Sequence, residues 1–172
     1  MPGRRQSYHT RHGFTLVELM VVVSIVGVLA AVAMDRLLFY TERAEKAAVD
    51  ATLAAAKMGL RIKLAELIMT NRQMAATQLE RENPMRWLAE PPSNYLGEYS
   101  AAPKPGNWYF ATDSMQLVYR PGSTRYLQLN ADDGKELRFQ VRLYYEEIDT
   151  ISGKARGLAG IGLVPVRPYR WF

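Results

Sequence analysis

Apolar side chains fill almost every position from Phe14 to Met34, a run of 21 residues. A helix of that length spans roughly 31 Å at about 1.5 Å per residue, which is close to the thickness of the hydrocarbon core of a bilayer. The run therefore predicts a membrane-spanning helix over residues 14–34. Glu18 is the one ionisable residue in it. Because an unpaired carboxylate inside a membrane is costly, we expect Glu18 to meet a positively charged partner.

The helical pattern continues beyond this run with a regular spacing of apolar positions. Six apolar residues follow one another at intervals of three or four, which places them on one stripe of a helix. They are Val49, Leu53, Ala56, Leu60, Leu64 and Leu67. Residues 35–80 are therefore expected to form an amphipathic helical half that docks on a sheet, and the helix is expected to end near Met74 or Leu79. Glu42 and Lys46 stand four residues apart in the order that favours an ion pair on a helix.

Residues 81–106 are interpreted as a loop that connects the helix to the sheet. Asn83 and Pro84 favour the start of a short helical turn, because Asn is a good N-cap and Pro fits the first helical position. Three large aromatic residues of the loop are expected either to contact another molecule or to pack on the edge of the sheet. These are Trp87, Tyr95 and Tyr99.

Four later segments are rich in Tyr, Phe, Leu and Val and are separated by turn residues, which predicts an antiparallel meander. The predicted strands are 107–112, 115–120, 125–130 and 136–147. In the last of them Leu137, Phe139, Val141 and Leu143 alternate with charged or polar residues, so one face is buried. The sequence therefore predicts an α+β fold in which the helix packs on a four-stranded antiparallel sheet. Residues 107–172 hold the sheet and the tail, and 35–172 form one domain outside the membrane.

The tail from Arg156 to Phe172 interleaves basic and aromatic residues, a composition that is compatible with single-stranded nucleic acid or a protein partner. Two prolines within residues 164–168 exclude that run from the middle of a sheet, so edge pairing or wrapping over the surface is expected. The chain has 22 basic and 17 acidic residues, but three of the basic ones lie in residues 1–13. Because the remainder is close to neutral, a nucleic-acid partner is not expected.

The residues needed for most hydrolytic chemistry are missing from residue 14 onward. There is no cysteine, and the two histidines, His9 and His12, both precede the apolar run. A Ser-His-Asp triad, a Cys-His dyad and a His-ligated zinc site are therefore excluded there. Glu146, Glu147 and Asp149 form an acidic cluster that could serve a glycosidase, but a solvated strand end explains it better. The chain is predicted not to be an enzyme.

Asp132 and Asp133, next to Gly134, are the candidate metal ligands. Calcium requires six or more oxygen ligands, and only this pair of carboxylates is apparent. An Asp-Gly pair is also a common hairpin turn. We therefore expect no cofactor, with calcium at Asp132 and Asp133 as the alternative.

The start of the apolar run has a distinctive order of residues. A short basic stretch leads into Gly13-Phe14-Thr15-Leu16-Val17-Glu18, and the apolar run follows. This order resembles the amino-terminal segment of type IV pilins and type II secretion pseudopilins, in which a prepilin peptidase cuts after the glycine and methylates the new terminal phenylalanine. The resemblance covers about 30 of the 172 residues. It implies cleavage between Gly13 and Phe14, N-methylation of Phe14, a role for Glu18 in assembly and processing, and a pilin-like fold.

The chemistry of Glu18 is consistent with that resemblance. Cleavage would leave a positively charged amine on Phe14, and in a bundle of staggered copies the amine of one subunit can neutralise Glu18 of its neighbour. Because the pairing is favourable only in low dielectric and only between chains that are offset along the axis, it can set register as well as affinity. The alternative is a Glu18 side chain that reaches the lipid headgroups, since it stands about one helical turn from the membrane edge.

The resemblance implies a structural subunit of a type IV pilus or a type II secretion pseudopilus. The implied partners are prepilin peptidase, other pilin or pseudopilin subunits, an inner-membrane assembly platform and membrane lipid. Arg4, Arg5 and Arg11 precede the run without any acid among them, which favours a cytoplasmic leader over residues 1–13 and an exported remainder. The expected location is the bacterial inner membrane, with a single pass and a periplasmic domain, and then the filament.

Two departures from the family pattern favour a minor pilin or a pseudopilin. Asp35 stands where family members commonly carry a proline, and no cysteine can close a C-terminal loop. The alternative function is a signal-anchored periplasmic binding or adaptor protein that does not polymerise. Ala31-Val32-Ala33 also has the form of a signal-peptidase site, but the run is longer than the apolar core of an export signal, which is about 7 to 15 residues.

Overall fold

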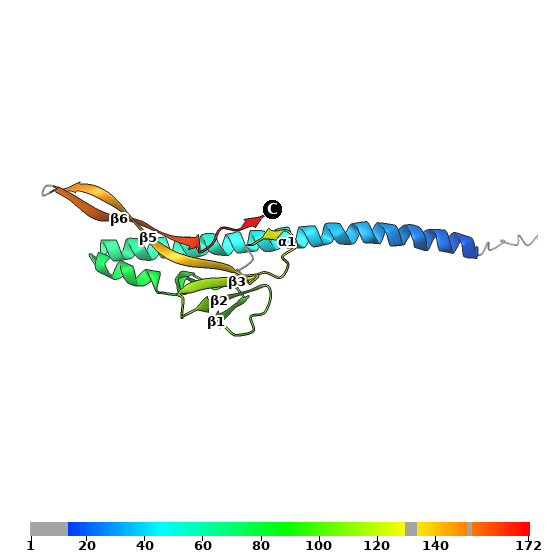
Figure 1. Cartoon of the computed structure of the whole chain (residues 1–172), viewed down its shortest axis with the longest axis horizontal. Helices are drawn as coiled ribbons and strands as arrows, with labels where there is room; N and C mark the ends of the chain where they lie inside the picture. Colours follow the sequence, from blue (N-terminus) through cyan, green and yellow to red (C-terminus); the bar gives the residue numbers. More distant parts are fainter. Residues whose placement is uncertain (1–13, 130–133, 151–152) are drawn as a thin grey trace, which may run out of the picture. The chain divides into compact units, whose positions relative to one another are not determined.

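The computed structural model describes residues 14–129, 134–150 and 153–172. A long helix, α1 (Leu16–Met69), is followed by two 3-10 helices, η1 (Gln73–Glu80) and η2 (Pro84–Trp87). The strands of the described part are β1 (Tyr95–Glu98), β2 (Asn107–Ala111), β3 (Gln116–Arg120), β4 (Leu127–Gln128), β5 (Leu137–Thr150), β6 (Gly153–Pro165) and β7 (Arg170–Trp171) (Figure 1).

The chain divides into two compact units, Met1–Tyr40 and Thr41–Phe172, and the boundary falls inside α1. The described part of the first unit is the beginning of α1 with the two residues before it. The second unit contains the rest of α1, both 3-10 helices and every described strand. The fold of the second unit is the α+β arrangement that the sequence predicts, with the helix packed on a mostly antiparallel sheet.

Both ends of α1 have local causes in the sequence. At the start, the Thr15 hydroxyl accepts a hydrogen bond from the Glu18 backbone N–H at 3.2 Å, as an N-cap does. At the end, Asn71 adopts a left-handed conformation with φ of 56°, and the Arg72 N–H donates to the Leu67 carbonyl at 2.8 Å. Asn is one of the few residues that tolerate this conformation at a helix C-terminus. The predicted helix end near Met74 or Leu79 is therefore wrong, and the residues after Asn71 form η1 instead.

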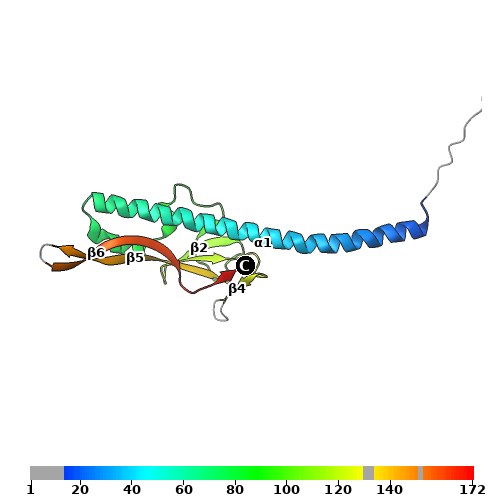
Figure 2. The same ribbon diagram turned by 90° about the horizontal axis from the view of Figure 1, so that it is seen from above.

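The main sheet of the second unit has the order β1-β2-β3-β5-β6. β1 runs parallel to β2, and all other neighbours in this sheet are antiparallel. The predicted strands 107–112, 115–120 and 136–147 are confirmed as β2, β3 and β5. β5 and β6 are the longest of the described strands, and β6 pairs along its whole length with β5 from Phe139 to Thr150 (Figures 1 and 2).

Three parts of the sheet differ from the sequence prediction. Residues 95–98 form β1 inside the predicted loop, and residues 153–165 form β6, which makes five strands in the main sheet instead of four. The predicted strand 125–130 is reduced to β4, which leaves the main sheet and pairs with β7. β6 could not be predicted from strand propensity, because it contains several glycines, which disfavour strands. Its pairing with β5 outweighs this low propensity. Its place at the sheet edge, with Pro165 as its last residue, confirms the predicted edge pairing of this run.

The core lies between α1 and one face of the main sheet. All six residues of the predicted helical stripe are buried there, and so are Leu137, Phe139, Val141 and Leu143 of β5. The Trp108 ring is at the centre, 4.7 Å from the Tyr119 ring centroid. Gly59 lets η2 lie directly against α1, because a Cβ at this position would collide with the Trp87 carbonyl oxygen. The sequence therefore encodes the docking of helix on sheet in its apolar spacing.

Candidate assembly and processing site

The described part of the first unit presents apolar side chains on all sides of one helix. Every residue from Phe14 to Leu38 is exposed within the chain, including Phe14, whose side chain is 80% exposed. α1 is the one described helix that is long and apolar enough to cross a membrane. A helix that is apolar all round requires lipid or neighbouring helices around it. The structure thus has an uncovered apolar surface where the sequence predicts the membrane span.

Glu18 lies in the first turn of α1 and is exposed. Among the described residues its carboxylate makes no ion pair or hydrogen bond, and Arg36 is the nearest basic residue that follows it in the sequence. A separation of 18 residues corresponds to about 27 Å of helix, which is too far for a contact. A positive partner for Glu18 within the described part of α1 is therefore absent.

Of the two residues at the predicted cleavage site, the structure describes one. Phe14 is described, whereas Gly13 lies outside the described residues. The structure therefore places Phe14 and Glu18 together in the first turn region of α1 and leaves the geometry of the Gly13-Phe14 bond open. Cleavage, methylation and the role of Glu18 in assembly stay predictions.

The sequence analysis missed a second apolar surface, on the part of α1 in the second unit. Eight exposed residues alternate at spacings of four and three on the side of the helix opposite the buried stripe. We call them the outer stripe: Ala44, Ala48, Ala51, Ala55, Met58, Ile62, Ala65 and Met69. Met58 is 60% and Ile62 63% exposed. A strict alternation of four and three is the spacing of helices that pack against other helices, and this signal could have been found by scanning for it.

An acidic pair on α1 joins the helix to the loop between β3 and β4. Glu42 is only 1% exposed and accepts hydrogen bonds from the Ser123 hydroxyl at 2.8 Å and the Tyr126 N–H at 2.9 Å. Glu45 accepts from the Gly122 N–H at 2.6 Å. The predicted Glu42–Lys46 pair is wrong, because Glu42 turns into the protein and Lys46 pairs with Asp50 at 2.6 Å.

The aromatic residues of the connecting segment pack within the second unit. Tyr95 accepts a hydrogen bond from the Asn83 side chain at 2.6 Å, and Asn83 also caps η2 by accepting from the Met85 N–H at 3.0 Å. Lys63 lies 4.9 Å above the Trp87 ring. The predicted turn at Asn83 is confirmed. Packing on the sheet is shown for Tyr95, which belongs to β1, and for Tyr99, whose ring lies 6.0 Å from that of Tyr109 in β2, whereas Trp87 lies against α1.

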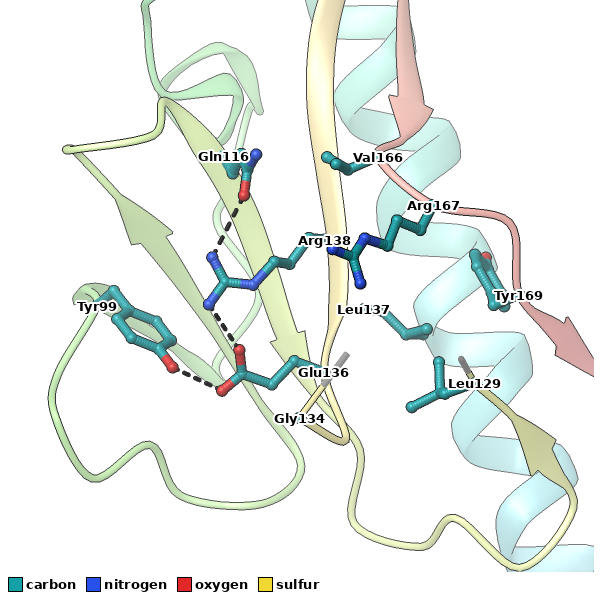
Figure 3. A pocket seen from close by; sticks show the side chains of 10 residues that line it. All are labelled: Tyr99, Gln116, Leu129, Gly134, Glu136, Leu137, Arg138, Val166, Arg167 and Tyr169. Carbon is teal, nitrogen blue, oxygen red and sulfur yellow. Dashed lines mark hydrogen bonds and ion pairs between the residues drawn. The ribbon is translucent and has the colours of Figure 1, made fainter. Parts of the chain in front are cut away.

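A pocket of about 510 Å³ lies beside the start of β5 (Figure 3). Its polar wall is held by Glu136, which accepts from the Tyr99 hydroxyl at 2.7 Å and pairs with Arg138 at 2.9 Å. Burial and the hydrogen bond to Glu136 raise the pKa of Tyr99 above its ordinary value. Both carboxylate oxygens of Glu136 already have partners, Tyr99 and Arg138. Glu136 is therefore an ion-paired residue of the pocket wall and not a free general acid or base.

The remaining candidate residues do not form a site. Asp132 and Asp133 lie outside the described residues, so the calcium alternative is untested. In the part of the chain that is described, no three acidic, His or Cys residues are close enough to hold a metal. Glu146 and Glu147 are exposed on β5, and Glu147 pairs with Lys154 of β6 at 3.1 Å. This exposed position agrees with a solvated strand end.

Comparison with known proteins gives one family match and several relatives. The prokaryotic N-terminal methylation motif matches residues 8–34. The chain is 49% identical over 45 residues to a type IV narrow pilus major component of Thermus thermophilus, which is 26% of this chain and 39% of the relative. It is 37% identical over 87 residues to a type IV major pilin protein of Neisseria gonorrhoeae, which is 51% of this chain and 47% of that protein.

A third relative is the type IV major alpha-pilin of Moraxella bovis, which is 38% identical over 58 residues, 34% of this chain and 36% of the relative. The chain thus spans less than half the length of these curated relatives. No solved structure matches the chain. The motif match includes Gly13, Phe14 and Glu18, which are the residues on which the sequence prediction rests.

Proposed function

Because this chain belongs to the type IV pilin family, we propose that it is a structural subunit of a type IV pilus. Members of this family are filament subunits, and the chain is not an enzyme. The family also implies processing by prepilin peptidase and contact with other pilin subunits. The proposal includes cleavage after Gly13, methylation of Phe14, a cytoplasmic leader and an exported second unit.

The observation that carries the proposal is the unpartnered Glu18 at the start of an exposed apolar helix. A charge in this position is unfavourable by about 2 to 3 kcal/mol in a membrane. The amine that cleavage creates on Phe14 of a neighbouring subunit is a partner of opposite charge. Pairing of the two in a filament removes this penalty, and apolar side chains of neighbouring helices cover the rest of the surface.

The outer stripe adds support from the second unit. Its spacing suits a neighbouring helix, and its alanines permit close approach. A subunit of a type II secretion pseudopilus would use the same surfaces. The proposal therefore includes a pseudopilus as the other filament that this chain could build. A minor rather than a major subunit is favoured by Asp35 in place of the common proline.

The test is expression of the full chain with and without a prepilin peptidase, followed by intact mass, amino-terminal sequencing and filament counts. We expect a chain that begins at methylated Phe14 only when the peptidase is present. Glu18→Ala should then reduce filaments by roughly thirtyfold or more, since about 2 kcal/mol of pairing is lost. Glu146→Ala, which removes an exposed carboxylate on β5, is the matched control and should leave filaments unchanged.

A chain that keeps its leader in the presence of the peptidase would contradict the proposal and favour the signal-anchored adaptor. A chain that begins after Ala33 would contradict it too, in favour of ordinary export. Correct processing with no filament under any condition would favour an adaptor that does not polymerise.

A further inference from the structure

The backbone of β7, near the C-terminal end of the chain, belongs to a separate two-stranded sheet and not to the main sheet. Among the described strands β7 pairs only with β4, through Leu127 opposite Trp171 and Gln128 opposite Arg170. A ladder of two residue pairs is too short to be stable by itself. Yet the Trp171 side chain is only 4% exposed and belongs to the main core. Contacts other than the ladder must therefore keep this end in place.

Besides the packing of its rings, this end makes a buried polar contact with Glu42 of α1. The Trp171 indole N–H donates to Glu42 Oε1 at 3.0 Å, across a separation of 129 residues. The same oxygen accepts from the Tyr126 N–H at 2.9 Å, and Oε2 accepts from the Ser123 hydroxyl at 2.8 Å. A buried carboxylate is tolerated only when it is hydrogen-bonded in this way. One carboxylate therefore joins three segments: α1, the loop before β4, and β7.

Glu45, one turn further along α1, binds the loop, and among the described residues it makes no hydrogen bond to β7. It accepts from the Tyr119 hydroxyl at 2.7 Å and from the N–H groups of Gly122 and Ser123 at 2.6 and 3.3 Å. Both acids thus accept hydrogen bonds from the loop, and of the two only Glu42 also accepts one from Trp171. This difference supplies a matched control on the same helix.

We propose that residues 167–172, which we call the strap, open and close on α1 independently of the main sheet, and that Glu42 fastens the closed state. Within the described part of the chain, the backbone of the strap has a ladder of two residue pairs with β4 and one further bond, from the Phe172 N–H to the Tyr126 carbonyl at 3.4 Å. Its rings are docked: Trp171 lies in the core, the Tyr169 ring lies 6.0 Å from that of Phe139 in β5, and the Phe172 ring stacks on Tyr126 at 5.5 Å. Because it has far less backbone pairing than β2 and β3, the strap is expected to open at a lower free energy than they do. Opening would expose the Trp171 ring and strip Glu42 of one of its donors. The chain has no cysteine, so the closed state is reversible and not covalently locked. This conformational device does not depend on the proposed function.

The test is hydrogen exchange of the full chain in detergent micelles, followed by mass spectrometry of peptides from the strap, the loop 121–126 and strands β2 and β3. In the unmodified chain the strap should exchange at least tenfold faster than β2 and β3. Glu42→Gln should speed exchange in both the strap and the loop. Trp171→Phe, which keeps an aromatic ring but removes the indole N–H, should speed exchange in the strap alone, and Glu45→Gln in the loop alone.

Strap exchange at the rate of β2 and β3 in the unmodified chain would overturn the proposal, because the strap would then open only with global unfolding. Equal acceleration of all peptides in Glu42→Gln would overturn it as well, since Glu42 would be a general stabiliser. Should Glu42→Gln fail to fold, Trp171→Phe alone decides: unchanged strap exchange in that variant rejects Glu42 as the fastening.

Discussion

At the scale of single residues, Tyr119 couples the stability of the second unit to pH. Its hydroxyl donates to Glu45 across the interface of β3 and α1. Burial, and then the hydrogen bond to Glu45 and its negative charge, raise the pKa of Tyr119 far above its ordinary value of 10.0. The folded state therefore keeps a proton that the unfolded chain loses above pH 10. Its contribution to the free energy of unfolding is complete below pH 10 and falls as the pH rises further.

We predict that Tyr119→Phe flattens the alkaline decline in stability. The slope that it removes is at most about 1.4 kcal/mol per pH unit. Urea unfolding followed by tryptophan fluorescence at pH 8, 10 and 11 measures it. Tyr99 and Tyr169 also have raised pKa values, mainly because of burial, so part of the decline should remain. Parallel curves for the two proteins between pH 8 and 11 would contradict the prediction.

The acidic residues show how far sequence reasoning reached at this scale. The place of Glu18 in the first turn of an apolar helix could be predicted because its environment is local: an apolar run, a preceding glycine and the positions between them. Its role in assembly stays a prediction. The environment of Glu42 could not be predicted, because its donors include Trp171, 129 residues away. Spacing on a helix predicted an ion pair with Lys46, but the Glu42 carboxylate is buried and accepts hydrogen bonds from Ser123, Tyr126 and Trp171 instead. The i,i+4 spacing rule fails where folding brings hydrogen-bond donors from distant parts of the sequence to the same side chain.

At the scale of elements, periodicity identified the elements that have one buried face. The inner stripe of α1 and the alternation in β5 were predicted because each has its own repeat. β1 and β6 were missed because both depend on a partner: β1 on the edge of β2, and β6 on pairing with β5 along its whole length. The predicted end of α1 was too late in the sequence. The apolar residues after Asn71 suggested further helix, but the left-handed conformation of Asn71 ends it.

The outer stripe of α1 yields a prediction at this scale. Ile62→Glu places a charge in the middle of a surface that we propose to meet a neighbouring helix. It should leave processing at Phe14 intact and reduce filaments by about tenfold or more, since burial of an unpaired carboxylate costs at least 1.4 kcal/mol. Electron microscopy and filament yield measure the effect. Met74→Glu changes an apolar residue of η1 that is 92% exposed and lies off the stripe, so normal yield is expected from it.

For Ile62→Glu, a normal yield of filaments would show that the outer stripe faces solvent in the assembly. Loss of the processed subunit itself would instead place the effect on folding or export. The amount of processed chain in the membrane fraction therefore has to be measured beside the filaments.

At the scale of the whole molecule, the two units bury their apolar side chains against different surroundings. The second unit buries its residues within the chain, as Leu60 does at 0% exposure, whereas Leu29 of the first unit is 62% exposed. The three tryptophans of the chain, Trp87, Trp108 and Trp171, all lie in the second unit. Their fluorescence therefore reports the unfolding of that unit alone.

The same substitution in the two units should accordingly change different properties of the protein. Leu60→Ala leaves a cavity between α1 and the sheet and should lower the free energy of unfolding by about 2 to 5 kcal/mol. Leu29→Ala should leave this value unchanged and weaken retention in the membrane and incorporation into filaments, because less apolar surface is covered there. Urea unfolding in micelles, with membrane fractionation of the same two variants, separates the effects. An equal loss of unfolding free energy in both variants would mean that the two units fold as one, against the division of the chain at Tyr40 and Thr41.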